Sequence, residues 1–279
     1  MLNLDQKRRY RDEGYLVLPG FKTAAEIAAL RARALEIVAA FDPAEGGGVF
    51  STRDQARTAD DWFLGSADRV RCFFEEEAFD TAGRLRQPKA LSINKIGHAL
   101  HDLDPVFERF SHGPALAELA ADLGLVDPRL WQSMFIFKQP GIGGEVRWHQ
   151  DASFLHTEPV SVTGFWFALE DATLDNGCMW VEPGGHRGPL RERFVRAGDA
   201  VHMTTLDTTP WPEQACAVPL EVAAGSLVCF HGLLPHYSAP NRSAVSRHAY
   251  TLHASDGRCA WASDNWLQRG PQAPPLRGF

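Results

Sequence analysis

Four residues in the second half of the chain have the types and spacing of a metal-dependent oxidation site. They are His149, Asp151, His236 and Arg247. Two histidines and one carboxylate are the ligands of non-haem iron(II) sites that keep coordination positions open. An arginine can bind the far carboxylate of 2-oxoglutarate through two parallel hydrogen bonds. Together these residues predict an iron(II)- and 2-oxoglutarate-dependent oxygenase.

The His149-x-Asp151 triplet alone is weak support for this chemistry, because chance supplies about one such triplet in a chain with 11 His and 19 Asp in 279 residues. His156-x-Glu158 offers the same ligand types, although Pro159 directly after it would interrupt strand pairing. The choice between the two triplets depends on what surrounds them.

The distal histidine has several candidates, since His231, His248 and His253 lie in the same region as His236. Only His236 is followed by a serine two residues later (Ser238) and by Arg247 eleven residues later. These two offsets favour His236.

The composition describes a globular protein and argues against two classes of partner. The hydrophobic content is 44%, the formal charge is −7 and the pI is near 5.9. No sustained Lys/Arg run occurs, so we expect neither nucleic acid nor a membrane as a partner. The composition does not fix the oligomeric state.

The five cysteines are scattered, odd in number and without a Cys-x-x-Cys pair. They predict neither a disulfide framework nor a cysteine zinc site. The N-terminus has no apolar signal core, and no stretch approaches 18 apolar residues. We therefore expect a cytoplasmic protein.

The predicted elements that position the site are helical in the N-terminal part of the chain and mainly strands after it. Thr23 to Glu26 forms a capping box that opens a helix to about Phe41, with a face of Ile27, Leu30, Ala34, Leu35 and Val38. The strands that we predict then lie near 131–138, 146–152, 162–170, 178–182, 218–222, 226–231, 235–238 and 246–253.

This order predicts a mainly β protein with flanking helices, folded as a double-stranded β-helix of the jelly-roll or cupin-like kind. We expect one domain over residues 1–279, with a helical N-terminal part of about 1–125 and a jelly-roll core of about 130–255. The long segments 42–66 and 183–216 read as irregular and are the predicted covers of the pocket.

On these strands, the first two candidate ligands are expected on the same face of one strand. His149 and Asp151 are two residues apart, so their side chains leave the same face of an extended segment. Most of a jelly roll fits between His149 and His236. Arg247 is expected on a strand next to the one that carries His236.

The chain resembles the phytanoyl-CoA dioxygenase family from about Gly14 to Leu267. Beyond the His-Gln-Asp triplet, His236, Ser238 and Arg247, the resemblance rests on blocks that include Ser92-Ile93-Asn94-Lys95-Ile96-Gly97-His98, Phe137-Lys138-Gln139-Pro140 and Asp151-Ala152-Ser153-Phe154-Leu155. One departure is Gly185, where relatives usually have serine in Pro-Gly-Ser-His.

The resemblance implies a double-stranded β-helix that uses iron(II), 2-oxoglutarate and O₂. It implies His149, Asp151 and His236 as metal ligands and catalytic residues, with Arg247 on the distal carboxylate of 2-oxoglutarate. It also implies that the cosubstrate pocket contains Ser238, Lys95, Trp166 and Met134.

The expected reaction is hydroxylation of a small organic or acyl substrate with release of succinate and CO₂. Asp151 favours hydroxylation, because iron halogenases of this general fold lack that carboxylate. Two alternatives stay open: a cupin-like metal-dependent isomerase or hydrolase, and a 2-oxoglutarate-binding protein without turnover.

Overall fold

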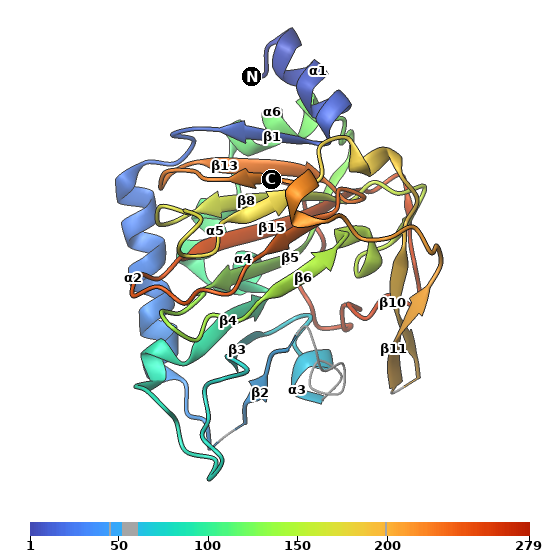
Figure 1. Ribbon diagram of the computed structural model, residues 1–279. Helices are drawn as coiled ribbons and strands as arrows, with labels where there is room; N and C mark the ends of the chain where they lie inside the picture. Colours follow the sequence, from blue (N-terminus) through green and yellow to red (C-terminus); the bar gives the residue numbers. More distant parts are fainter. Residues whose placement is uncertain (45, 52–60, 199) are drawn as a thin grey trace.

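Two facing β-sheets form the core of the computed structural model, which describes residues 1–44, 46–51, 61–198 and 200–279 (Figure 1). The larger sheet is antiparallel except for its last pair. Its strands are, in spatial order, β1 (Tyr15–Leu18), β13 (Leu227–His231), β8 (Thr163–Ala168), β15 (Ala249–Asp256), β5 (Pro128–Ile136), β4 (Ile93–His98), β3 (Val70–Phe74) and β2 (Gly48–Val49).

The smaller sheet lies across the inner face of the larger one. Its spatial order is β12 (Val218–Leu220), β9 (Met179–Val181), β14 (His236–Ser238) and β6 (Val146–His149). Apolar side chains from both sheets fill the space between them, among them Trp166, Met179, Val181, Val228 and Phe230. This is a jelly-roll arrangement in which His149 and His236 lie on strands of the smaller sheet and Asp151 follows two residues after His149.

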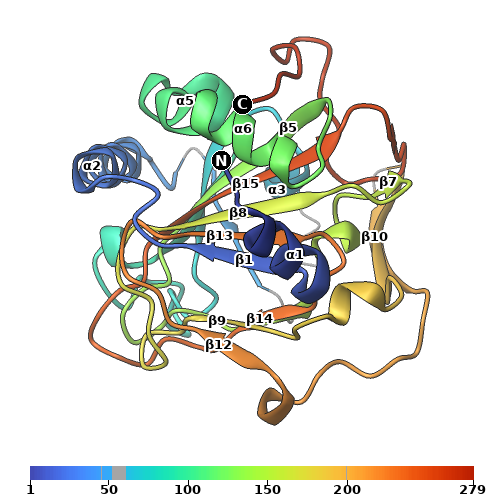
Figure 2. The same ribbon diagram turned by 90° about the horizontal axis from the view of Figure 1, so that it is seen from above.

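Helices cover the outer face of the larger sheet, as Figure 2 shows for α2, α5 and α6. The larger sheet is covered on both faces because its central strands are apolar on both faces, as in β8. Phe165 and Phe167 belong to the apolar core under the helices, whereas Trp166 and Ala168 belong to the core between the sheets. The α-helices are α1 (Leu4–Glu13), α2 (Ala24–Ala40), α3 (Asp61–Leu64), α4 (Leu100–Leu103), α5 (Pro105–Ser111) and α6 (Pro114–Asp122).

The predicted helix after Thr23 is present as α2. The Thr23 side chain accepts a hydrogen bond from the Glu26 backbone, and the Glu26 side chain accepts one from the Thr23 backbone, which completes the capping box. Ile27, Leu30, Ala34 and Val38 are buried as expected. Leu35 is not: it is 46% exposed, because it lies toward the edge of the predicted face.

Each of the eight predicted strands has a counterpart, with boundaries shifted by at most three residues. The prediction that 183–216 is irregular was wrong. This segment contains the hairpin of β10 (Glu192–Ala197) and β11 (Ala200–Thr205), which pair over six residues each. Its strands are mostly half-buried, so they lack the apolar runs by which the core strands were recognised.

The remaining short elements connect the main ones. They are β7 (Thr157–Glu158), β16 (Ala260–Trp261) and the 3₁₀ turns η2 (Lys89–Leu91), η3 (Asp151–Ser153), η4 (Gly185–Arg187) and η5 (Gln214–Cys216). Within the predicted cover at 42–66, residues 45 and 52–60 lie outside the described residues. None of the helices in the described part of the chain is long and apolar enough to span a membrane.

Candidate metal centre and cosubstrate pocket

Three of the predicted residues meet where the smaller sheet ends. His149 is the last residue of β6, Asp151 opens η3, and His236 begins β14. His236 is paired directly with His149 across the two strands, and their rings lie 4.0 Å apart. Asp151 Oδ1 lies 3.6 Å from His236 Nε2 and 3.9 Å from His149 Nε2.

Backbone carbonyls fix the orientation of both imidazoles. His149 Nδ1 lies 2.8 Å from the Arg147 carbonyl, and His236 Nδ1 lies 3.0 Å from the Leu234 carbonyl. A ring nitrogen that faces a carbonyl must carry the proton, because a carbonyl only accepts. Nε2 of each ring is therefore the bare nitrogen, and both Nε2 atoms face Asp151. Such carbonyl contacts commonly orient metal-binding histidines.

The surroundings of His149 and Asp151 shift the pKa of each group. Burial, reinforced by the neighbouring His236, lowers the pKa of His149 to about 3. For Asp151, burial raises the pKa, but the interactions with the imidazoles of His253 and His236 outweigh it, so the pKa lies below its usual range. A neutral imidazole and an ionised carboxylate are the forms that bind a metal.

The donor set fits a non-haem iron site. Two nitrogens and one carboxylate oxygen converge within 4.8 Å of one another, and they come from one side, which leaves coordination positions for other ligands. This is the one group of three or more such side chains within metal-binding distance among the described residues.

The alternative ligands are placed elsewhere. His156 lies 3.8 Å from Glu158, whose side chain is 81% exposed and has no third ligand beside it among the described residues. His248 packs against Phe135 and Phe137 on the helix-covered face of the larger sheet. The structure brings His149, Asp151 and His236 together and leaves His156 and His248 apart from them.

Arg247 does not lie on a strand beside His236, and this expectation was wrong. It precedes β15, which belongs to the larger sheet, whereas His236 lies in the smaller one. The strands adjacent to β14 are instead β9 and β6, because the chain crosses between sheets after Ser238. Arg247 and His236 are thus on opposite sheets.

Arg247 is nevertheless a buried cation in need of an anion. It is 2% exposed, its guanidinium carbon lies 5.3 Å from the Trp166 ring, and its Nε has no hydrogen-bond partner among the described residues. Burial lowers its pKa to about 10, so the guanidinium is charged at neutral pH. A buried charge without a partner is costly, and a carboxylate ligand would offset that cost.

Lys95, Met134 and Trp166 line up on the inner face of the larger sheet. Met134 is paired with Thr251, and Thr251 with Trp166, across three neighbouring strands. Lys95 Nζ lies 3.9 Å from the Met134 sulfur and 3.4 Å from the centre of the Phe50 ring. Lys95 is 5% exposed, which rules out the reading of an ordinary surface lysine, and burial lowers its pKa to about 7.

Ser238 is buried between the two sheets, two residues after His236. Its hydroxyl donates a hydrogen bond of 2.9 Å to the Gly177 carbonyl. The oxygen can still accept, but its one hydrogen is engaged.

Residues that the sequence analysis did not single out also build the site. Gln150, between the two motif ligands, is fully buried; its amide donates to the carbonyls of Pro189 and Leu233, and its oxygen accepts from the Arg191 backbone. His253, set aside as a distal ligand, lies 3.2 Å from Asp151 through its Nε2. Side chains alternate between the two faces of a strand, so the spacing of His253 from Thr251 could have indicated that both face the inside of the barrel. No local sequence pattern indicated the role of Gln150.

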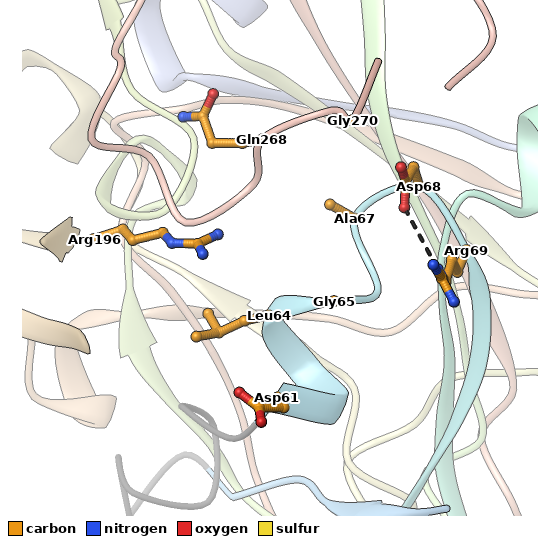
Figure 3. Close-up of a pocket in the computed structure, with 9 residues that line it drawn as sticks. All are labelled: Asp61, Leu64, Gly65, Ala67, Asp68, Arg69, Arg196, Gln268 and Gly270. Carbon is orange, nitrogen blue, oxygen red and sulfur yellow. Dashed lines mark ion pairs between the residues drawn. The ribbon is translucent and has the colours of Figure 1, made fainter. Parts of the chain in front are cut away.

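A separate cleft of about 330 Å³ lies beside α3 (Figure 3). Its walls carry Asp61 and Asp68 together with Arg69 and Arg196, so charges of both signs face it. None of the three ligands lines this cleft. It is therefore not the metal centre.

Comparison with known proteins identifies the family. The sequence profile described as phytanoyl-CoA dioxygenase matches residues 10–249, which is most of the chain. The chain belongs to the phytanoyl-CoA dioxygenase family. It is accordingly a 2-oxoglutarate-dependent dioxygenase whose cofactors are iron(II), 2-oxoglutarate and O₂, in agreement with the ligand triad.

Relatives from plants and animals match over almost their whole length. The chain is 48% identical over 277 residues to a phytanoyl-CoA dioxygenase of Arabidopsis thaliana, with 99% of this chain and 96% of the relative covered. It is 45% identical over 282 residues to phytanoyl-CoA dioxygenase domain-containing protein 1 of Bos taurus, with 98% and 97% covered.

Solved structures confirm the double-stranded β-helix fold. The carbocyclase SnoK of nogalamycin biosynthesis, described as non-haem and α-ketoglutarate-dependent, is similar with a TM-score of 0.65 at 20% identity, covering 100% of this chain and 94% of that chain. EctD from S. alaskensis in its apo form gives a TM-score of 0.65 at 20% identity, covering 100% and 87%. At such identities the likeness concerns the fold.

Proposed function

We propose that the protein hydroxylates a small organic or acyl substrate and converts 2-oxoglutarate into succinate and CO₂. Two observations support this proposal. An open His-Asp-His triad lies at the end of the smaller sheet, and the buried Arg247, on the side of the larger sheet, has no anionic partner among the described residues. A metal centre alone would not require Arg247. A dicarboxylate that binds the metal at one end requires a cation at the other.

In this assignment His149, Asp151 and His236 hold the metal, and bound iron(II) supplies the oxidising chemistry with 2-oxoglutarate and O₂. Arg247 binds the distal carboxylate of 2-oxoglutarate, and a positioned cosubstrate reacts more readily than a free one. Trp166, beside the guanidinium, excludes water from it.

Three further residues complete the cosubstrate pocket in this proposal. Lys95 supplies a second positive charge, and Met134 contacts it from the neighbouring strand. Ser238 contributes by turning its hydroxyl from the Gly177 carbonyl toward the ligand. Each assignment predicts weaker binding of 2-oxoglutarate when the side chain is truncated.

The substrate proposal follows from chemistry near the triad. Phe154 contacts the His149 ring and also Phe194 of β10, so apolar surface borders the metal centre. A coenzyme A moiety would need a cationic surface for its phosphates, and the cleft beside α3 mixes Arg69 and Arg196 with two aspartates. We therefore propose a small substrate, with neither nucleic acid nor a membrane as partner.

We further propose that residues 1–279 act as one catalytic domain in the cytoplasm. The strands of the larger sheet come from both ends of the chain, since β1 pairs with β13 and β4 with β5. A cut near residue 125 would therefore separate paired strands. All five cysteines are free thiols, which suits a reducing compartment.

The test is an anaerobic titration of the metal-free protein with iron(II) and 2-oxoglutarate, followed by the weak visible charge-transfer band of the chelate. We expect the band in the natural protein, none in His149→Ala, and a much higher 2-oxoglutarate requirement in Arg247→Ala. No band from folded, metal-loaded protein would contradict the proposal.

Turnover separates the two other functional classes. A metal-dependent hydrolase or isomerase would keep its activity in Arg247→Ala, because it needs no dicarboxylate cosubstrate. A 2-oxoglutarate-binding protein without turnover would show the band but form no succinate with any candidate substrate. Succinate formation that depends on both His149 and Arg247 is the outcome we expect.

A further inference from the structure

The two carboxylate oxygens of Asp151 have different surroundings. Oδ1 faces the bare Nε2 atoms of His149 and His236. Oδ2 is turned into the protein, where it is fully buried and has no aligned hydrogen-bond partner among the described residues. There the imidazole of His253 approaches it, with Nε2 3.2 Å from Oδ2. His253 therefore contacts the oxygen that the metal would not use.

His253 is a rigid support for this contact. It lies in β15, in the middle of the larger sheet, where it is paired with Gly164 of β8 on one side and Gln132 of β5 on the other. It is 4% exposed. Asp151, by contrast, lies in η3, directly after a four-residue strand of the smaller sheet. The contact therefore connects a ligand near the end of one sheet to the centre of the other.

Gly164 provides the space for this arrangement. A Cβ atom at Gly164 would lie 2.9 Å from Asp151 Oδ2 and 2.4 Å from the Phe230 ring, both closer than real Cβ contacts allow. The backbone of β8 thus comes up against the carboxylate, where only glycine fits. Asp151 Oδ2 occupies a slot formed by Gly164 and His253.

The surroundings of the His253 ring favour the tautomer that can donate a hydrogen bond from Nε2 to Asp151. Its Nδ1 is buried and has no hydrogen-bond partner among the described residues. A proton on Nδ1 would be a buried donor without an acceptor, whereas a proton on Nε2 faces a carboxylate. The neutral ring therefore carries its proton on Nε2, toward Asp151.

We propose that His253 is a positioning residue for the metal centre, which holds Asp151 Oδ2 so that Oδ1 alone faces the metal. This inference rests on the proposed role of Asp151 as a ligand. The terminal torsion of an aspartate is broad, so an unsupported carboxylate samples orientations that do not bind. A group that orients a ligand in this way typically contributes about 10- to 100-fold to metal affinity.

His253 is not a fourth ligand in this arrangement. Its Nε2 faces Oδ2, on the side of the carboxylate away from the two histidines, and it is not part of the group of converging ligand atoms. A ligand role would instead place its nitrogen beside Oδ1.

The experiment measures Mn(II) affinity of the metal-free protein, from the electron paramagnetic resonance signal of free Mn(II). We expect His253→Leu to bind Mn(II) about 10- to 100-fold more weakly. His253→Gln, whose amide can donate to the same oxygen, should recover most of that loss. His248→Leu is the matched control, since His248 is equally buried but contacts Phe135 and Phe137, and it should bind as the natural protein does.

A double-mutant cycle separates positioning from a general loss of structure. The effect of His253→Leu should disappear when Asp151 is already replaced in Asp151→Asn, because the oxygen that it orients no longer binds as a carboxylate. A loss that persists in that background would overturn the inference. If His253→Leu does not fold, His253→Ala in the same cycle carries the test, with His253→Gln again as the variant that should recover affinity.

The outcomes also distinguish this inference from the proposed function. Natural affinity in His253→Leu together with lost affinity in His149→Ala would overturn the role of His253 and leave the metal centre intact. Natural affinity in both variants would overturn the ligand assignment itself.

Discussion

At the scale of single residues, two buried cations distinguish this metal centre from a simple metal-binding barrel. Arg247 and Lys95 both project from the larger sheet, and neither forms an ion pair with a carboxylate in the described part of the chain. They differ in chemistry: the guanidinium stays charged, whereas burial brings the pKa of Lys95 to about 7. The two cations should therefore respond differently to pH.

Lys95 predicts a pH dependence for binding of 2-oxoglutarate. As the pH rises through about 7, the ammonium of the ligand-free protein loses its proton and with it the attraction for a carboxylate. We expect the Kd of 2-oxoglutarate, measured anaerobically with Mn(II) between pH 6 and 8.5, to increase over this range. Lys95→Arg keeps its charge, so its Kd should change less with pH. If the Kd of the variant and of the natural protein change equally with pH, the Lys95 proton has no role in binding.

At the scale of elements, the site depends on how η3 is tied to its surroundings. Gln150 connects Asp151 to the segment before β10 and to the segment before β14 through three hydrogen bonds. The contact of Phe154 with Phe194 adds an apolar connection to β10. Gln150 is not a ligand, but its hydrogen bonds hold the turn that carries Asp151 in place.

Gln150→Ala should therefore weaken both the fold and metal binding. It leaves two buried carbonyls without donors, which costs about 1–3 kcal/mol of unfolding free energy, and it frees the turn that carries Asp151. Gln139→Ala is the matched control: Gln139 is equally buried and donates to the carbonyls of Ala90 and Ile93, away from the motif. Urea unfolding should show a similar loss in both variants, and Mn(II) affinity should fall in Gln150→Ala only.

At the scale of the whole molecule, buried neutral histidines connect stability to pH. Burial lowers the pKa of His101, of His231 and of His248 to about 4 each. In the unfolded chain the same groups titrate near 6.5. The unfolded state therefore binds more protons between pH 6.5 and 4, and folding loses stability as the pH falls through this range.

We expect the free energy of unfolding, measured by urea titration, to be highest above pH 6.5 and to decrease steadily toward pH 4. His101→Asn, which removes a fully buried imidazole, should be less stable at pH 7 but lose less on acidification. If the free energy of unfolding of the variant decreases with pH as steeply as that of the natural protein, His101 does not contribute to the acid loss. The part of the acid loss that comes from His101 should be independent of the metal centre, since His101 lies in α4 under the larger sheet.

Much of the local structure follows from the sequence by itself. The α2 cap, the eight core strands and the shared side of His149 and Asp151 depend on residues a few positions apart, where capping and side-chain alternation operate. The His-x-Asp spacing places both side chains on one side even though the strand ends at His149, because Gln150 is still extended. Such features need no knowledge of distant partners.

The tertiary structure alone decided how distant segments meet. The sequence pattern placed Arg247 beside the strand of His236, but the crossing between sheets after Ser238 puts it opposite. The burial of Lys95 and the approach of His253 and Gly164 to Asp151 arise from pairing between strands that are 30 to 100 residues apart. Register across a sheet is set by the whole core at once, so no local pattern of residues contains it.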